Sequence, residues 1–192
     1  MAFVVVQHLD PNHKGIMREL LQRITQMEVF TVTDRQKVKP NCVYIIPPNK
    51  NMSILNGSLY LFDPVETRGL RLPIDFFFRS LADDRRHQSI GIVLSGMGSD
   101  GSLGLQAIKE QDGIVLVQEP QSAKFDSMPH HAIEAVQSDI VASANELPEK
   151  LIALVNNSPI SKTGKNLEKD PSALEKIVIL LRSQTGNDFS HY

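Results

Sequence analysis

Two residues capable of acid–base chemistry follow apolar runs in this 192-residue sequence. His8 comes shortly after the run at 3–6, and Asp100 lies in the loop after the run at 89–94. In a nucleophilic triad a histidine takes and returns a proton, while an aspartate fixes its tautomer and stabilises the imidazolium. The two residues therefore indicate two thirds of a triad, although the same pattern fits a histidine in a loop hydrogen bond and an aspartate at a helix N-cap.

The loop that holds Asp100 also fits a different chemistry. Gly96, Gly98 and Gly101 satisfy the G-x-G-x-x-G pattern between a strand and a helix, and Glu119 ends the next strand. This pattern is typical of dinucleotide binding, so a nicotinamide-dependent oxidoreductase is the alternative function. Against it, the aspartate in the loop would repel a pyrophosphate at the helix N-terminus. The same backbone amides could instead form an oxyanion hole.

The elements that must position these residues alternate between strand and helix. Short apolar runs predict strands at 3–6, 29–32, 43–46, 89–94, 113–117 and 139–142. Helical spacing predicts helices at 13–24, 73–81, 102–111, 128–136 and 147–155. Asn-Gly between the two apolar halves of 52–62 predicts a hairpin. The expected fold class is α/β, with a doubly wound, mostly parallel sheet, helices on both faces and a small antiparallel hairpin. Because parallel-strand ends gather ligands, His8 and Asp100 are expected to meet.

Composition excludes several functions. With 20 basic and 22 acidic side chains the net charge is −2, so no nucleic-acid partner is expected. No apolar stretch is long enough to span a bilayer, and the first residues lack the basic region of a signal peptide. A single cysteine, Cys42, fits a reducing compartment and cannot form a Cys-rich metal site. We expect a cytoplasmic protein without a metal or an organic cofactor.

Several motifs, taken together, resemble the CheB-type chemotaxis methylesterases. Gln7-His8-Leu9 is similar to the family's histidine motif, and the segment 94–101 to its aspartate motif. The segments 43–48, 73–75 and 127–129, which read VYIIPP, PID and SMP, follow in the family's order. The resemblance covers about residues 2–155.

The resemblance implies a protein-glutamate methylesterase that also deamidates certain glutamines. Its partner would be a methylated chemoreceptor or a related signalling protein, and its context would be two-component signal transduction. Carried over to this chain, His8 is the general base and acid, Asp100 orients it, and the backbone N–H of Met97, between Gly96 and Gly98, donates to the oxyanion.

The family's nucleophile does not appear in the sequence. The family's serine lies in a glycine-rich turn upstream of the histidine strand, and no G-x-S-x-G occurs in this chain. Ser95 and Ser99 lie on the aspartate loop, so we interpret them as loop residues, Ser99 forming a hydrogen bond at the helix start. Either the chain is a fragment or the domain is a non-catalytic binding module. We favour a fragment, because the other motifs are intact and the chain begins inside a core strand.

The sequence also predicts the domain boundaries. Residues 1–156 form the methylesterase domain without its first strand and serine turn, and residues 157–170 form a linker. Residues 171–192 resemble the start of a receptor methyltransferase that follows this domain in some signalling proteins. The parent protein would then be a methylesterase–methyltransferase fusion, and the chain alone would be inactive.

Overall fold

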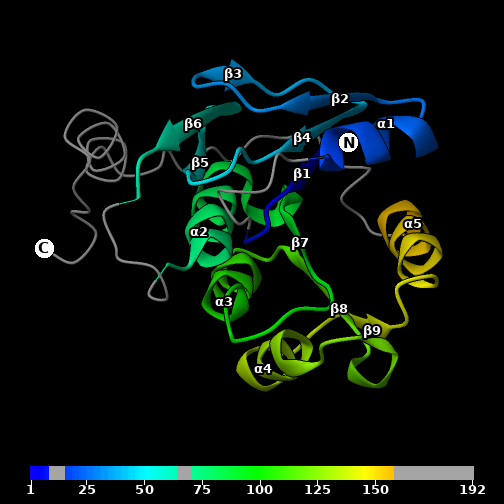
Figure 1. Cartoon of the computed structure of the whole chain (residues 1–192). Helices are drawn as coiled ribbons and strands as arrows, with labels where there is room; N and C mark the ends of the chain where they lie inside the picture. Colours follow the sequence, from blue (N-terminus) through cyan, green and yellow to red (C-terminus); the bar gives the residue numbers. More distant parts are fainter. Residues whose placement is uncertain (9–15, 65–70, 158–192) are drawn as a thin grey trace, which may run out of the picture.

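A computed structural model describes residues 1–8, 16–64 and 71–157, and these residues form an α/β fold (Figure 1). The strands are β1 (Phe3–Val5), β2 (Glu28–Thr31), β3 (Gln36–Lys37), β4 (Cys42–Ile45), β5 (Asn51–Leu55), β6 (Ser58–Phe62), β7 (Ile90–Val93), β8 (Ile114–Gln118) and β9 (Ile140–Ala142). The helices are α1 (Met17–Ile24), α2 (Pro73–Arg85), α3 (Ser102–Glu110), α4 (Ser127–Ala135) and α5 (Leu147–Asn157), with short 3₁₀ turns at Arg86–Gln88 and Pro120–Ser122.

The parallel strands form two three-stranded sheets, ordered β1-β4-β2 and β7-β8-β9. The central strands β4 and β8 are buried at every position. Alternate side chains of β8 enter two different cores: Val115 and Val117 pack with α2, α3 and α4, whereas Ile114 and Leu116 pack with α5. Helices therefore cover both faces, as predicted, and the expected fold class is confirmed (Figure 1).

The outer edges of β1 and β7 face a common cavity of about 420 Å³. Within the described residues, no strand pairs with either of these edges, which is why the parallel strands form two sheets instead of one. The cavity has a mainly apolar lining that includes residues of α2, of β7 and in or next to β1: Ala2, Phe3, Val4, Phe77, Phe78, Ile90 and Ile92. We refer to it below as the β1–β7 cavity.

The predicted hairpin is present as β5 and β6, joined at Asn56 and Gly57. Both turn residues have positive φ, 50° and 71°, as a two-residue hairpin loop of the Asn-Gly type requires. A two-residue strand, β3, extends this sheet to the order β3-β6-β5 and was not predicted, because Gln36–Lys37 has no apolar alternation. Helix α2 packs on β5 and joins the hairpin to the main core.

The helix predicted near the start of the chain is present as α1 (Met17–Ile24). In α1, Leu20 and Ile24 are 47% and 80% exposed, and Leu21 packs on the sheet. Residues 9–15 and 158–192 lie outside the described residues, and with them the predicted start of this helix, most of the predicted linker and the segment 171–192 that resembles a methyltransferase. None of the described helices combines the length and apolarity needed to cross a membrane.

Candidate functional site

The structure brings together the two residues that the sequence singled out for acid–base chemistry. His8 follows β1, Asp100 follows β7, and His8 Nε2 lies 2.7 Å from Asp100 Oδ2 although the residues are 92 positions apart. The Asp100 side chain is 4% exposed, whereas that of His8 is 50% exposed. A buried carboxylate thus holds one nitrogen of a half-exposed imidazole, and Nδ1 is left without a described partner.

Two backbone amides at the start of α2 hold the Asp100 carboxylate. The N–H of Ile74 donates to Oδ2 at 3.0 Å, and the N–H of Asp75 donates to Oδ1 at 2.9 Å. The alternative role of Asp100, as N-cap of its own helix α3, is not what the structure has, because that position is Gly101 with φ of 96°. The positive end of the α2 dipole and these donors stabilise the ionised carboxylate in a buried place.

The contact with Asp100 favours the charged form of the imidazole. The pKa of His8 is raised above its ordinary value, chiefly by the hydrogen bond to Asp100 and further by that residue's charge, while partial burial lowers it. A base whose conjugate acid is stabilised in this way takes a proton from a nucleophile more readily.

This raised pKa predicts how stability depends on pH. Folding favours protonated His8, so its contribution is complete below the unfolded pKa of about 6.5 and is lost as pH rises through the higher folded value. We expect the difference in unfolding free energy between the wild type and His8→Gln to shrink as pH rises, measured by urea denaturation. The exposed His87 provides the control, His87→Gln, which should leave the pH slope unchanged. Equal slopes in all three proteins would contradict the contact.

The glycine loop is hydrogen-bonded to Phe125, just before α4, and to Met128, in the first turn of α4. Gly96 N–H donates to the carbonyl of Phe125 at 3.0 Å, and the Gly96 carbonyl accepts from Met128 N–H at 3.0 Å. Gly98 has φ of 86°, and an added Cβ there would meet no atom within 4 Å. Met97 is 73% exposed, and among the described residues its N–H has no acceptor. In this loop the N–H of Gly96 is therefore occupied, whereas that of the next residue, Met97, has no acceptor among the described residues.

Ser95 and Ser99, the two serines of this loop, form hydrogen bonds with neighbouring segments of the fold. Ser95 Oγ accepts from Phe125 N–H at 2.9 Å, and Ser95 N–H donates to the buried side chain of Gln118. Ser99 contributes its carbonyl to the start of α3 by accepting from Ser102 N–H, but no side-chain cap is formed there. Both are loop residues, as interpreted from the sequence.

The glycine loop lacks free helix N-terminal amides at which a dinucleotide pyrophosphate could bind, as far as the described residues show. Asp75 Oδ1 accepts from the N–H of Gly104 in the first turn of α3 at 2.6 Å, so a carboxylate already occupies the amide end where a pyrophosphate would bind. Asp100 occupies the corresponding end of α2. The expected ribose-binding residue, Glu119, is exposed and opens a 3₁₀ turn.

Sequence reasoning missed the donors that hold Asp100. The amides of Ile74 and Asp75 carry no side-chain signature, and Asp75 entered only as part of a motif. The signal that could have found it is an aspartate in the first turn of a helix that begins with proline.

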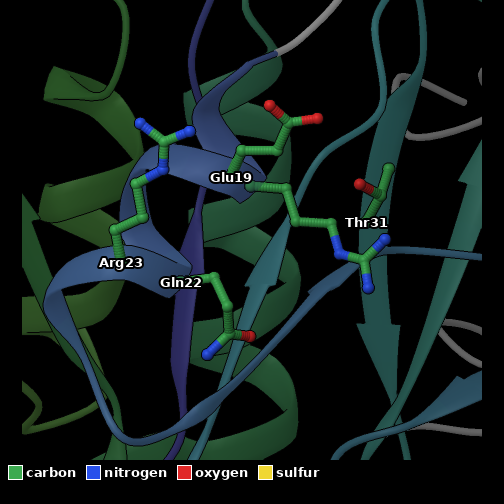
Figure 2. A pocket seen from close by; sticks show the side chains of 5 residues that line it. Glu19, Gln22, Arg23 and Thr31 are labelled. Carbon is green, nitrogen blue, oxygen red and sulfur yellow. The ribbon is translucent and has the colours of Figure 1, made fainter.

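A second hollow, of about 570 Å³, lies between α1 and β2 (Figure 2). Its polar side chains serve the edge of the sheet: Arg18 Nε donates to the carbonyl of Val29, and Gln22 Oε1 accepts from the N–H of the same residue. Strand β2 is an edge strand, so these contacts satisfy backbone groups that would otherwise be open to another chain. We assign this hollow no ligand. In the part of the chain that the structure describes, no three His, Cys, Asp or Glu residues are grouped to bind a metal ion.

Comparison with known proteins gives a consistent result. The family model described as CheB methylesterase matches residues 1–151. A relative from Thermotoga maritima named protein-glutamate methylesterase/protein-glutamine glutaminase is 31% identical over 156 residues, which cover 79% of this chain and 45% of that protein. A relative from Leptospira interrogans is 31% identical over 159 residues, which cover 82% of each chain.

A solved structure agrees with these matches. The crystal structure of the Thermotoga maritima CheB methylesterase catalytic domain aligns with a TM-score of 0.67 at 32% identity, over 79% of this chain and 82% of that one. The dinucleotide-binding alternative gains no support from these similarities.

Proposed function

The chain belongs to the CheB methylesterase family, a family of carboxylic ester hydrolases, and we propose that His8 is the general base and acid of its reaction. The observation that carries this proposal is the 2.7 Å hydrogen bond between His8 Nε2 and the buried Asp100 carboxylate. With Nε2 held by Asp100, Nδ1 is the nitrogen that exchanges a proton with the reacting groups.

The reaction follows the sequence of a serine esterase. A serine Oγ attacks the carbonyl of a glutamate γ-methyl ester while His8 takes the serine proton, and His8 returns this proton to the departing methanol. His8 then takes a proton from water, the hydroxide attacks the acyl-enzyme, and the returning proton frees the serine. Attack on a glutamine side chain by the same steps would release ammonia. Asp100 stabilises the imidazolium in both halves.

Met97 N–H is proposed as an oxyanion donor. The amide lies in the loop that leads to Asp100, lacks a described acceptor and belongs to a highly exposed residue. Gly96 and Gly98 shape this loop, and Gly98 takes a backbone conformation that favours glycine. A preorganised amide of this kind contributes by meeting the charge that develops on the carbonyl oxygen.

The nucleophilic serine is proposed to arrive on a further parallel strand, from a segment other than 1–192, that fills the β1–β7 cavity. Two observations support this position. The cavity exposes the edges of β1 and β7 that pair with no described strand, and it is lined largely by apolar side chains, which suits a strand buried on both faces. The loops after β1 and β7 meet at the His8–Asp100 bond, so a parallel strand between them would end beside His8.

The substrate is proposed to be a methylated chemoreceptor or a related signalling protein in the cytoplasm, within a two-component pathway. The names of relatives, which include both methylesterase and glutaminase activity, support this substrate class. We further propose that the parent protein is fused to a receptor methyltransferase through the linker after α5. A 104.1 kDa protein from Rhodobacter capsulatus that is 41% identical over 117 residues, 12% of its length, supports placing this domain in a much larger chain.

The test compares the present chain with a version extended by the upstream coding sequence. We expect the extended protein to release methanol from methylated receptor and to react with a fluorophosphonate probe, and the 192-residue chain to do neither. His8→Gln in the extended protein should abolish methanol release, whereas the control His87→Gln, at an exposed position in the 3₁₀ turn after α2, should not.

Two results would contradict the proposal. His8-dependent methanol release by the 192-residue chain would show that no additional strand is needed. An upstream sequence without a glycine-flanked serine, together with an inactive extended protein, would favour a non-catalytic binding module of the same fold.

A further inference from the structure

The helices α2 and α3 begin beside each other, and each N-terminus is capped by a carboxylate from the other segment. Asp100, which precedes α3, accepts from the first amides of α2, Ile74 and Asp75. Asp75, in the first turn of α2, accepts from the N–H of Gly104 in the first turn of α3 at 2.6 Å. Neither helix has a side-chain cap from its own N-cap residue, which is Leu72 in α2 and Gly101 in α3.

This reciprocal capping depends on a close approach of the two helices. A Cβ at position 104 would lie 2.5 Å from Phe78 Cβ and 3.1 Å from Asp75 Cα, so glycine is what allows the α3 amide to reach the Asp75 carboxylate. Gly101 is similarly confined, since an added Cβ would lie 2.9 Å from a methyl group of Ile74. The contact between Asp75 and Gly104 is therefore built into the packing of the two backbones.

Placing two carboxyl groups side by side in the protein interior is electrostatically unfavourable. Asp75 and Asp100 are each 4% exposed and lie next to each other. Burial raises the pKa of Asp75, and so does the charge of Asp100, while the hydrogen bond from Gly104 and the charge of Arg79 lower it. An ordinary serine or threonine N-cap would satisfy the same amides without a second buried acid. When a helix is capped by a buried acid instead of an ordinary N-cap residue, the departure indicates that the acid has a functional role.

We propose that Asp75 is a positioning residue: by fixing the start of α3 to the start of α2, it keeps the two α2 amides aimed at Asp100 and so keeps Asp100 aimed at His8. Among the described residues, Asp75 forms no hydrogen bond with His8. Without the Asp75–Gly104 hydrogen bond, α3 and the loop before it can shift relative to α2, and the Asp100 carboxylate loses its alignment. The inference concerns the site described above and rests on the role proposed there for His8 and Asp100.

Two substitutions separate the geometry of Asp75 from its charge. Asp75→Asn keeps an oxygen acceptor at the same distance from Gly104 but removes the charge, whereas Asp75→Glu keeps the charge but moves the acceptor by one methylene. Ser80→Ala is the control for a general effect on α2, because Ser80 Oγ accepts from Ile54 N–H and has no contact with the acid pair.

The readout is the titration of the His8 imidazole, followed by NMR in the 192-residue chain. We expect Asp75→Asn and Ser80→Ala to retain the raised His8 pKa, and Asp75→Glu to lower it toward the ordinary value of histidine. The extended protein gives a second readout: Asp75→Glu should lower kcat by about tenfold or more with KM little changed, as expected for misplaced catalytic groups.

Each contrary result overturns the proposal. A lowered pKa in Asp75→Asn with an unchanged one in Asp75→Glu would mean that Asp75 acts by charge alone. No change in either variant would mean that Asp100 is aligned without Asp75, and a change in both or in Ser80→Ala would remove the specific role of the Gly104 hydrogen bond. Because the His8 titration needs no catalysis, it remains informative even if the proposed esterase activity fails its own test.

Discussion

Asp100→Asn is expected to lower kcat of the serine-containing extended protein by about 10⁴-fold, the size of effect that the loss of the carboxylate has in serine hydrolases. Asp100 accepts from three donors, the amides of Ile74 and Asp75 and Nε2 of His8. An asparagine must place its NH₂ group toward one of these donors. If the NH₂ faces His8, Nε2 becomes an acceptor and Nδ1 carries the proton, so Nδ1 can no longer act as the base.

The same variant should lower the pKa of His8, since the hydrogen bond and the charge that raise this pKa are both weakened. Both effects can be measured, by methanol release from methylated receptor and by NMR titration. Asp139→Asn is the matched control, because Asp139 also accepts from a backbone amide, that of Val115, but lies near the amino end of β8 and away from His8. An Asp100→Asn protein with near-normal kcat would rule out the orienting role of Asp100.

Phe77→Ala is expected to lower the free energy of unfolding by about 3–5 kcal/mol, the usual cost of removing a fully buried aromatic ring. Phe77 is 1% exposed and belongs to the core that joins α2 to both parallel sheets and to the hairpin. Its ring also lines the β1–β7 cavity, so the substitution enlarges a space that is already present. A loss of this size is a large part of the 5–15 kcal/mol that stabilises a typical domain.

Urea denaturation followed by circular dichroism measures this loss. Phe125→Ala is the control, because the Phe125 side chain is 47% exposed and the contacts of this residue with the glycine loop are made by its backbone. We expect the control to change stability by about 1 kcal/mol or less. Equal losses in the two variants would contradict the central place of Phe77 in the core.

Local patterns in the sequence predicted most of the elements and two residues of the site. β4 and β8 are short apolar runs because both of their faces are buried, and the Asn56-Gly57 turn follows from the positive φ that only such residues tolerate well. His8 and Asp100 were found because each follows a short apolar run, at 3–6 and at 89–94. The short strand β3 and the exposed side of α1 were not predicted, since pairing and coverage of these segments depend on neighbours far away in the chain.

By itself, the sequence determined the order of strands and helices, the chemical types at the strand ends and the family. Only the tertiary structure decided which nitrogen of His8 faces Asp100, which amides hold that carboxylate, and that Asp75 caps α3 while Asp100 caps α2. The physical reason is that these contacts join groups 25 to 92 positions apart, and most of the donors are backbone amides, which every residue except proline carries. Local periodicity specifies an element, but the direction in which its first amides point is set by the packing of one helix on another.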